Sequence, residues 1–479
     1  MINKTIGELA RLCGGKISSN DTTAAERSFA GVSTDTRKVG DGQLFIPLSG
    51  ERFDGHDYVQ QARERGAAAA MWQENRPIPE PLSDWTLVLV DDPLAALQRL
   101  AAAYRSELPV RVVGITGSNG KTTTKDMVAA VLATVFRVHK TAGNLNNHIG
   151  LPLTILEMNE QTEAAVLEMG MSGFGEIELL TSIAKPDAAI ITNIGDAHLL
   201  QLGSREGIAR AKLEIASGLE PGGLLVYNGD EPLLKEALTR SPLPDGIAAQ
   251  SFGAQAGNDW VAHDMIIEAA GSSFILSRTA NGDAAADSSY AYKIPVPGSH
   301  NVLNAAAAIA VGINLGIEPE RIKEGLAELK ISGMRIETVR AYNGATVLND
   351  AYNANPTAVR AAIDLVERLN GFKRKWLVLG DMLELGPEEQ ALHREIGAYI
   401  TPDKADGVLT YGSLGRHIAE GAWAAFQASP QSVIHFEDKA ELSAWLINEL
   451  KPEDLVLVKG SRGMRMEEIV QALEQAMGG

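Results

Sequence analysis

Cysteine is almost absent from this 479-residue sequence. Its single cysteine, Cys13, excludes an intrachain disulfide, and we expect it to be a small core residue of the first helix rather than a nucleophile. The residues from Met1 to Thr5 lack the apolar run of a signal peptide. No segment approaches the ~20 consecutive apolar residues that span a bilayer. These absences favour a cytoplasmic protein without membrane insertion.

Positive charge is also scarce. The 43 Lys and Arg residues are outnumbered by 61 Asp and Glu residues, which gives a net charge of −18. A nucleic-acid-binding protein usually has a basic face, so no nucleic-acid partner is expected. Hydrophobic residues make up 45% and charged residues 22%, which is typical of a soluble globular protein. At about 150 residues per domain, this length predicts about three domains.

Short strands and helices alternate along the chain, which predicts an α/β protein. We expect a small N-terminal α/β domain over 1–107, a central domain with a parallel sheet and a phosphate loop over 108–331, and a C-terminal Rossmann-like domain over 332–479. The third domain lacks a G-x-G-x-x-G turn, so it is not expected to bind a dinucleotide. Residues 260–295 interrupt the alternation and predict a β-hairpin with its tip at Asn281-Gly282-Asp283.

The hydrophobic pattern places individual elements. Strands are expected over 29–33, 44–47, 86–90, 110–116, 164–168, 188–192, 224–228, 346–349, 376–380, 407–411, 433–436 and 455–459. Helices are expected over 6–13, 58–65, 93–105, 125–134, 301–315, 319–329 and 466–477.

The strongest motif is Gly114-Ile-Thr-Gly117-Ser118-Asn119-Gly120-Lys121-Thr122-Thr123, between a predicted strand and a predicted helix. Glycines allow backbone N–H groups to converge on phosphate oxygens, and the helix N-terminus adds partial positive charge. Lys121 is expected to reach the β- and γ-phosphates, and the Thr122 hydroxyl to bind Mg²⁺. The spacing departs from strict G-x-x-x-x-G-K-[ST], and the alternative is a glycine turn that opens a helix. The strand–loop–helix context favours the phosphate loop.

Three further residues could complete a metal site. Glu168 ends a predicted strand, His198 follows the next one, and Lys212 lies in Ala211-Lys212-Leu213. Ligands gather beyond the carboxyl ends of parallel strands, and Mg²⁺ prefers oxygen ligands, so Glu168 is the conventional member. Taken singly, Glu168 and His198 are more often loop contacts, and Lys212 is more often a solvated helix lysine. Spacing does not decide between these interpretations.

With these residues in hand, the sequence resembles the Mur ligases, ATP-dependent amide-forming enzymes of peptidoglycan precursor synthesis, over essentially its whole length. The segments that carry the resemblance are Ser33-Thr-Asp35-Thr-Arg37, the phosphate loop, Thr141-Ala-Gly-Asn144-Leu-Asn-Asn147-His-Ile-Gly150, Ala197-His198-Leu199, Gly298-Ser-His-Asn301-Val-Leu-Asn304, Asn349-Asp350-Ala-Tyr-Asn353-Ala-Asn355-Pro356, Gly380-Asp-Met382-Leu-Glu-Leu-Gly386 and Lys459-Gly-Ser-Arg462.

The Asn349–Pro356 segment discriminates within the family. It is similar to the member that adds D-alanyl-D-alanine. The member that adds the third amino acid typically has an Asp-Tyr-Ala-His-type sequence there, and folylpolyglutamate synthases of the same fold usually have Asp-Gly-Ala-His-Asn. The resemblance therefore implies an ATP-dependent ligase whose partners are UDP-N-acetylmuramoyl-tripeptide and D-alanyl-D-alanine. It leaves open whether the tripeptide ends in diaminopimelate or lysine. We expect a monomer.

The resemblance also implies a mechanism and residue roles. ATP converts a carboxylate into an acyl phosphate, which the incoming amine attacks. Lys121, His198 and Lys212 would be catalytic, with Lys212 carbamylated by CO₂ so that it joins Thr122, Glu168 and His198 around Mg²⁺. An unmodified lysine would repel the metal. The nucleotide would contact the phosphate loop from Gly117 to Thr123 and four further residues, Asn301, Asn304, Arg335 and Asp350.

The substrate residues implied in the same way are Ser33, Asp35, Arg37, Asn144, Asn147, Asn353 and Asn355. Taken alone, the first three are equally consistent with a polar turn after a strand. Asn301 alone is consistent with a helix N-cap, followed by an Asn304 that faces the core. Arg335 follows Ser332-Gly333-Met334, where the family often has Gly-Arg.

Two other classes of protein compete with a ligase. A non-catalytic phosphate-loop protein would have little reason to keep the set Lys121, Thr122, Glu168, His198 and Lys212. A phosphate-loop motor or kinase is disfavoured by the C-terminal α/β domain and by the lack of an apparent oligomerisation-type arginine motif. Two linkers, near 106–109 and 330–334, separate parts that must meet at one reaction centre, so we expect domain closure to gate catalysis.

Overall fold

The structure is a computed structural model, and it describes residues 1–18, 23–196, 198–279 and 286–475. Its fold is α/β, with three main sheets of five, nine and six strands along the chain, a further two-stranded sheet near the N-terminus, and helices between the strands. The predicted fold class is confirmed. In the described ranges no helix is both long and apolar enough to cross a membrane.

The N-terminal part holds two small sheets. β1 (Asn3–Thr5) pairs with β3 (Ser28–Ala30), and a five-stranded sheet has the order β2 (Lys16–Ile17), β7 (Leu87–Val90), β6 (Ala69–Gln73), β5 (Leu44–Phe45) and β4 (Val32–Ser33). The strand expected over 29–33 is therefore divided between two sheets. The division falls at Gly31, whose φ of +81° suits glycine and turns the chain.

Three helices pack in this part: α1 (Ile6–Cys13), α2 (Val59–Glu64) and α3 (Pro93–Glu107). The Thr5 hydroxyl accepts from the Glu8 N–H while the Glu8 carboxylate accepts from the Thr5 N–H, a capping box that begins α1 where the pattern predicted. Cys13 is fully buried, as expected for a core residue.

The central sheet has nine strands. Seven run parallel, in the order β9 (Val138–Lys140), β10 (Ala164–Glu168), β8 (Arg111–Thr116), β11 (Ala188–Ile191), β12 (Leu224–Asn228), β13 (Ala248–Gly253) and β14 (Trp260–Glu268). β15 (Gly271–Thr279) and β16 (Ala286–Ile294) extend it antiparallel. The hairpin expected over 260–295 is thus a three-stranded meander, and its expected tip at Asn281-Gly282-Asp283 lies outside the described residues.

The helices of the central part are α4 (Lys121–Leu132), α5 (Gly150–Glu157), α6 (Glu176–Ala184), α7 (Leu199–Leu202), α8 (Arg205–Leu213), α9 (Pro232–Arg240), α10 (Ser299–Asn314) and α11 (Pro319–Ala327). α4 packs against the sheet and against helices α10 and α11, and it shares with them one core built largely from alanine and branched aliphatic side chains. This burial fixes the start of α4, and with it the loop that precedes it.

The C-terminal sheet has six strands in the order β17 (Glu337–Arg340), β18 (Thr346–Asp350), β22 (Leu455–Lys459), β19 (Lys375–Gly380), β20 (Gly407–Tyr411) and β21 (Val433–Phe436). All except β17 run parallel. The helices are α12 (Pro356–Arg368), α13 (Glu389–Tyr399), α14 (Gly415–Trp423), α15 (Lys439–Glu449) and α16 (Glu467–Gln475). Residues 476–477, at the end of the expected last helix, lie outside the described residues.

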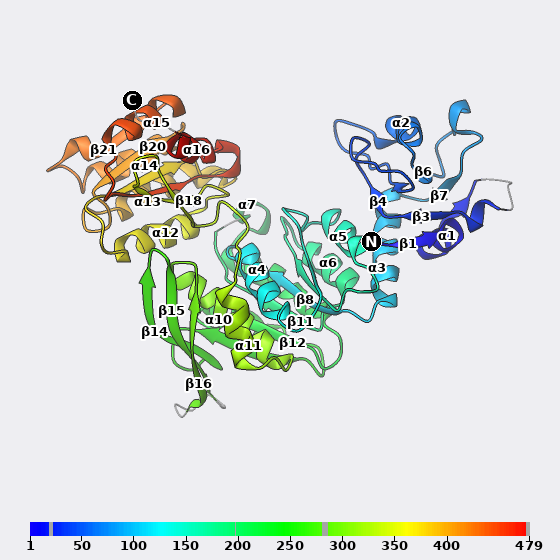
Figure 1. The fold of residues 1–479 in the computed structure, drawn as a ribbon, viewed down its shortest axis with the longest axis horizontal. Coiled ribbons are helices and arrows are strands. Elements are labelled where there is room, and N and C mark those ends of the chain that lie inside the picture. The colour runs from blue at the N-terminus through cyan, green and yellow to red at the C-terminus, as the bar shows by residue number, and fades with distance from the viewer. Residues whose placement is uncertain (19–22, 197, 280–285, 476–479) are drawn as a thin grey trace.

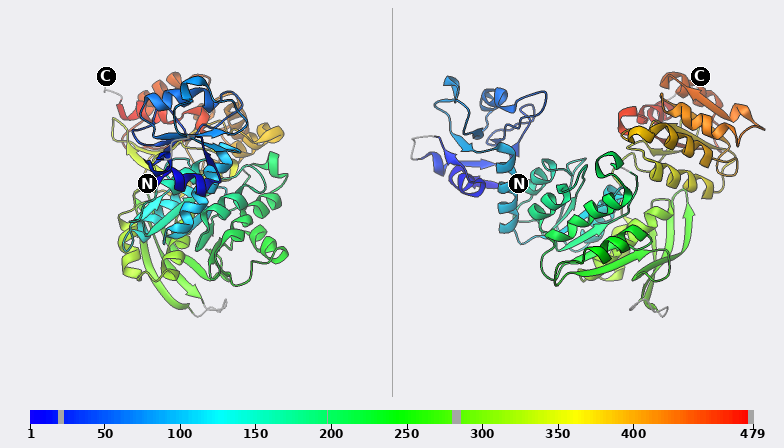
Figure 2. Two further views of the ribbon diagram at one scale, coloured as in Figure 1. Left: turned by 90° about the vertical axis from the view of Figure 1, so that its right-hand side faces the viewer. Right: turned by 180° about the vertical axis from the view of Figure 1, so that it is seen from behind.

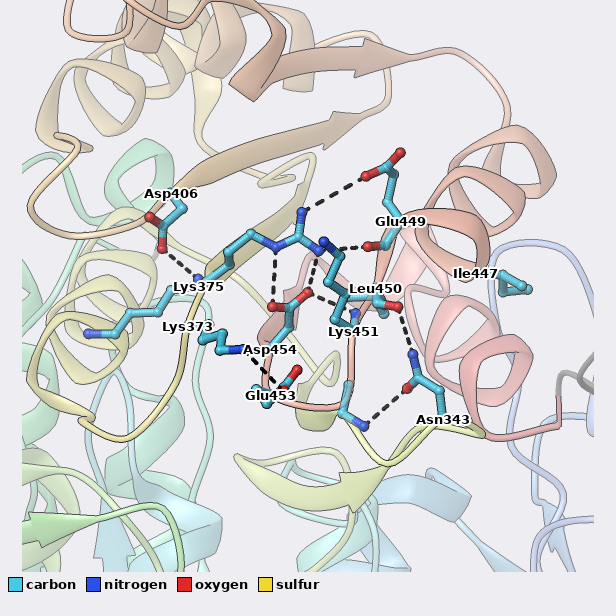
Figure 3. Close-up of polar contacts among 12 residues, drawn as sticks. Asn343, Lys373, Lys375, Asp406, Ile447, Glu449, Leu450, Lys451, Glu453 and Asp454 are labelled. Atoms are coloured by element: carbon cyan, nitrogen blue, oxygen red, sulfur yellow. Dashed lines mark hydrogen bonds and ion pairs between the residues drawn. The ribbon is translucent and has the colours of Figure 1, made fainter.

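The amino ends of these parallel strands are tied together by ion pairs and backbone contacts (Figure 3). Arg374, just before β19, donates to both carboxylate oxygens of Asp454, which precedes β22 and is buried. Asp406, just before β20, accepts from the Lys375 N–H at 2.7 Å. The amino edge of the sheet is thus occupied by structural contacts, which leaves the carboxyl edge, where ligands bind in such sheets, for function.

The N-terminal and C-terminal parts lie at opposite ends of the central part, so the molecule has the shape of an open V (Figures 1 and 2). α7 lies at the side of the central part that faces the C-terminal part. The three sheets fall within the three ranges expected as domains. The boundaries at 107 and 331 stay a prediction.

Candidate functional site

The loop from Gly117 to Gly120 joins β8 to α4, at the carboxyl end of the central sheet. Gly117 has φ +149°, and a Cβ atom there would lie 1.8 Å from the Thr192 Oγ1. Gly120 has φ +79°, and a Cβ atom there would lie 2.7 Å from the Asn304 Oδ1. Both positions therefore require glycine, as a loop whose backbone wraps a phosphate does.

Helix α4 begins at Lys121, four residues before the predicted start at 125, so the predicted start is wrong. The polar sequence Lys-Thr-Thr-Thr hid the first turn, because its side chains interrupt the apolar pattern. As a result Lys121 and Thr122 stand in the first turn, where helix N–H groups are free to bind an anion.

Neighbouring segments hold the loop in place. The Asn119 carbonyl accepts from the Thr192 Oγ1 at 2.5 Å, and the Asn119 N–H donates to the Asn193 Oδ1 at 3.0 Å. The Ser118 hydroxyl accepts from the Gly195 N–H at 2.8 Å. The loop after β11 therefore supports the phosphate loop along its length, which preorganises it for binding.

Lys121 folds back on this loop. Its Nζ donates to the Gly117 carbonyl at 2.8 Å and to the Ser118 carbonyl at 3.4 Å. Burial lowers the pKa of Lys121; the Glu168 carboxylate opposes this shift and Arg335 adds to it. These electrostatic effects place Glu168 and Arg335 near the ammonium group.

Glu168 ends β10 and is 3% exposed. Its Oε2 accepts from the Thr122 hydroxyl at 2.7 Å, and its Oε1 accepts from the Asn146 Nδ2 at 2.8 Å. Glu168 thus contacts the first turn of α4 and the loop before α5, and its role as a metal ligand stays a prediction. A threonine hydroxyl and a carboxylate, both oxygen donors at a phosphate loop, form a donor set that suits Mg²⁺.

Lys212 lies in α8 and is 2% exposed, so the alternative of a solvated helix lysine is wrong. Burial and the charge of Lys121 hold its pKa well below the ordinary lysine value. Lys212 and Lys121 both lower the pKa of His198, after burial, so the three side chains lie in one electrostatic neighbourhood. His198 precedes α7 and has a left-handed backbone, with φ +66°.

Asn301 and Asn304 occupy the first turn and a half of α10 and are both buried. Gly298 precedes the helix, so the alternative of Asn301 as the N-cap is wrong. Asn304 donates to the Asn301 Oδ1 at 3.2 Å and lies against Gly120 of the phosphate loop. Burial lowers the pKa of His300, which precedes Asn301, to about 4, and Asp350 and Lys459 of the C-terminal part have smaller, opposing effects.

The C-terminal part reaches the phosphate loop through Asn355, the N-cap of α12. Its Nδ2 donates to the Asn119 Oδ1 at 2.7 Å, and its Oδ1 accepts from the Asn119 Nδ2 at 3.3 Å. Thr357 donates to the Asp196 carboxylate at 2.9 Å. Asn355, expected near the dipeptide, therefore contacts the loop itself in this conformation.

Two more pairs lie at the same face of the C-terminal part. Lys459 donates to the Asp350 Oδ2 at 2.5 Å and to the Asn353 carbonyl at 3.0 Å. The Arg335 guanidinium lies 3.8 Å from the ring centroid of Tyr352, a cation–π contact. Asp350 and Arg335, both expected to contact the nucleotide, thus engage Lys459 and Tyr352 in this structure.

The N-terminal residues form the polar turn that was the alternative interpretation. The Asp35 N–H donates to the Ser33 Oγ, and Arg37 makes a bidentate pair with Asp35, which lowers the pKa of Asp35 to about 2. Arg37 is exposed, and β4, which carries Ser33, lies in the N-terminal part, away from the phosphate loop (Figure 1). Asn147 caps α5 by accepting from the Gly150 N–H, and Asn144 is exposed.

Sequence analysis did not identify several polar residues around the site. Asn146 holds Glu168, Asn193 holds the phosphate loop, Lys459 holds Asp350, and Tyr352 lies under Arg335. All but Asn193 lie in segments that carry the family resemblance, but their spacing alone did not say which of several polar residues points inward. No group of three His, Cys, Asp or Glu side chains positioned to hold a metal exists among the residues described.

Comparison with known proteins identifies the family. The profile described as "Mur ligase middle domain" matches residues 115–312, "Mur ligase, glutamate ligase domain" matches 334–462, and "Mur ligase family, catalytic domain" matches 28–105. UDP-N-acetylmuramoyl-tripeptide–D-alanyl-D-alanine ligase of Bacillus subtilis is 50% identical over 473 residues, 99% of both chains. The Escherichia coli enzyme of the same name is 36% identical over 479 residues, again 99% of both.

Solved structures agree. A crystal structure of MurF from Acinetobacter baumannii superposes with a TM-score of 0.88 at 31% identity and covers 99% of this chain and 100% of that one. MurF ligase from Thermotoga maritima in complex with ADP gives a TM-score of 0.80 at 30% identity, covering 93% and 97%. On its sequence, its fold and its phosphate loop alike, the chain belongs to the Mur ligase family.

Proposed function

We propose that this chain is an ATP-dependent, ADP-forming ligase that joins D-alanyl-D-alanine to UDP-N-acetylmuramoyl-tripeptide. The substrates follow from the names of relatives up to 50% identical over nearly the whole chain. The structural observation that supports the chemistry best is the Thr122–Glu168 hydrogen bond at a glycine-rich loop that also carries Lys121. The ADP complex of a relative supports a nucleotide at this loop.

The proposed reaction has two steps. An oxygen of the tripeptide carboxylate attacks the γ-phosphorus of ATP, and ADP leaves. The ammonium group of the dipeptide loses a proton, and the neutral nitrogen then attacks the carbonyl carbon of the acyl phosphate. The new C–N bond forms as the C–O bond to phosphate breaks, phosphate leaves with that electron pair, and the nitrogen releases its second proton. Lys121 and the loop N–H groups bind the phosphates and offset the developing negative charge. Catalysis thus rests on positioning and charge rather than on a covalent enzyme intermediate.

We propose that Thr122, Glu168, His198 and Lys212 hold Mg²⁺ in this site. When bound, Mg²⁺ would neutralise phosphate charge and so assist the transfer. The buried Lys212 fits a carbamate, because a low pKa leaves a neutral amine that can add to CO₂. The carbamate would supply oxygen ligands next to Glu168, where a protonated lysine would repel the metal.

We also propose a role for each part of the chain. Residues 1–107 would bind the UDP end of the substrate through Ser33, Asp35 and Arg37, and residues 108–331 would bind ATP, with Asn301 and Asn304 near the adenine. Asn144 and Asn147 would contact the tripeptide substrate. Residues 332–479 would bring Arg335 and Asp350 to the nucleotide, and Asn353 and Asn355 to the dipeptide. The working protein would be a cytoplasmic monomer.

Phosphate release tests the proposed function. Release should require ATP, UDP-N-acetylmuramoyl-tripeptide and D-alanyl-D-alanine together, and Lys121→Ala should abolish it. Release from ATP alone, or none with all three present, would contradict the proposal. Two UDP-tripeptides that differ only in diaminopimelate or lysine at the third position would then define the natural substrate.

A further inference from the structure

A tightly held loop follows the carboxyl end of β19, over residues 381–386. The Asp381 Oδ1 accepts from the Leu414 and Gly415 N–H groups at 3.1 and 2.7 Å. The Met382 N–H donates to the His393 Nε2 at 2.9 Å, and the Leu383 N–H donates to the Ser461 Oγ at 2.8 Å. The backbone that leads to Glu384 is therefore fixed.

Glu384 itself has a left-handed backbone, with φ +64°, and an exposed side chain. A non-glycine residue in this region costs about 1–2 kcal/mol, a strain that folded proteins store at functional sites. The fixed contacts on its N-terminal side maintain this conformation. The loop thus carries an exposed carboxylate on a fixed backbone.

The loop lies beside the catalytic part of the central sheet. Two residues after Glu384, a Cβ atom on Gly386 would lie 3.8 Å from the Leu200 side chain of α7. Two residues before Leu200 stands His198, which begins α7 and has the same left-handed backbone. The loop that carries Glu384 therefore lies beside the start of α7, next to His198.

The other carboxylates around the centre already have partners. Glu168 accepts from Thr122 and Asn146, and Asp350 accepts from Lys459. The remaining three are likewise engaged: Asp381 with the start of α14, Asp196 with Thr357, and Glu176 with the Ser172 N–H. Glu384, by contrast, makes neither a hydrogen bond nor an ion pair with any residue that the structure describes.

The proposed reaction needs a carboxylate that is free to bind the amine substrate. Lys121, Arg335 and Lys459 bring cations to the centre, which suits phosphate and carboxylate groups but repels an amine substrate that arrives as an ammonium ion. Resting on the function proposed above, we propose that Glu384 binds the ammonium group of the incoming dipeptide and so positions its nitrogen beside the acyl phosphate. Glu384 is thus a substrate-binding residue that the C-terminal part contributes.

Steady-state kinetics of Glu384→Gln test this role, with Glu388→Gln, an exposed carboxylate four residues away, as the matched control. Loss of one charge-assisted contact should raise the KM for D-alanyl-D-alanine by about 10-fold or more. The KM values for ATP and UDP-tripeptide should stay within about twofold. Glu384→Asp should have a KM for D-alanyl-D-alanine close to that of wild type, and Glu388→Gln should behave as wild type.

Two further measurements separate binding of the ammonium group from a structural role. N-acetyl-D-alanyl-D-alanine has no ammonium group, so it should inhibit wild type and Glu384→Gln with the same inhibition constant. ADP–ATP exchange that depends on UDP-tripeptide reports acyl-phosphate formation and should be unchanged in Glu384→Gln. An unchanged dipeptide KM, or equal losses for all three substrates, would overturn the inference. A wild-type protein that forms no product would instead contradict the proposed function.

Discussion

At the residue scale, Lys212 combines deep burial with a depressed pKa, and no hydrogen bond or ion pair to it is found within the described ranges. A charged lysine left in that state would be costly. The neutral amine is therefore favoured, and a carbamate would give the position oxygen atoms that Mg²⁺ can bind.

We predict that Lys212→Ala lowers turnover by more than about 100-fold, because the metal ligands would be incomplete. Short-chain carboxylic acids added to this variant, or Lys212→Glu, should restore part of the activity, since each returns a carboxylate to the site. Lys235→Ala, an exposed lysine on α9, is the control and should match wild type. Full activity in Lys212→Ala would refute the carbamate.

His300 gives a pH-dependent prediction. Its folded pKa of about 4 lies below the ordinary value of 6.5, so the unfolded chain takes up a proton that the folded chain does not. Below pH 6.5 this difference lowers the free energy of unfolding, by up to about 1.4 kcal/mol for each pH unit down to about pH 4. The effect is absent above pH 6.5.

Replacing His300 by Gln should remove this contribution. The melting temperature of His300→Gln should therefore fall less steeply than that of wild type between pH 6.5 and pH 4, in scanning calorimetry at matched ionic strength. Parallel pH profiles for the two proteins would show that His300 titrates normally in the folded state.

At the scale of elements, the phosphate loop depends on glycine in two ways. Gly120 has a left-handed φ of +79° and Asn304 directly against it, whereas Gly175, which begins α6, has φ +80° and nothing within 4 Å of the Cβ position. The two glycines therefore share the backbone strain of an alanine substitution but differ in the available space.

We predict that both Gly120→Ala and Gly175→Ala destabilise the protein by about 1 kcal/mol through backbone strain. Only Gly120→Ala should also weaken nucleotide binding, because the added methyl group displaces Asn304 and the loop. Titration calorimetry with a non-hydrolysable ATP analogue measures the difference. Equal affinities in the two variants would show that the loop tolerates a side chain.

The boundaries of the elements also show how accurately a hydrophobic pattern predicts secondary structure. The strands β10, β12, β20, β21 and β22 and the helix α1 agree with prediction at both ends. The errors lie where tertiary contacts override the pattern: the strand expected over 29–33 divides at Gly31, and α4 begins early because its polar first turn packs into the site.

At the scale of the whole molecule, the C-terminal part already touches the phosphate loop through Asn355–Asn119 and the loop after β11 through Thr357–Asp196. The N-terminal part lies at the other end of the V. The substrate must extend from the proposed UDP site to the phosphate loop. Closure of the V would bring the two together.

We predict that small-angle scattering shows a smaller radius of gyration when an ATP analogue and UDP-tripeptide are both bound, because substrate contacts would link the two ends. Either ligand alone should give a smaller change. An unchanged radius with both ligands at saturating concentrations would count against closure as a step of the reaction.

At this scale, the net charge of −18 is also compatible with a protein that binds anionic ligands. Anions would be bound by a few cationic side chains and N–H groups around the phosphate loop. The excess of acidic residues therefore lies elsewhere in the molecule. An acidic surface favours solubility and carries no information about the ligands.

The sequence by itself determined the α/β class, the phosphate loop with Lys121 and Thr122, and the resemblance to one family, because these depend on local pattern and on contiguous motifs. Only the tertiary structure decided which polar residues meet. Asn146 reaches Glu168, Asn355 reaches Asn119, and the loop that carries Glu384 lies beside α7, because the fold brings separate segments together. Burial, which sets the state of Lys212, is likewise a property of the folded chain.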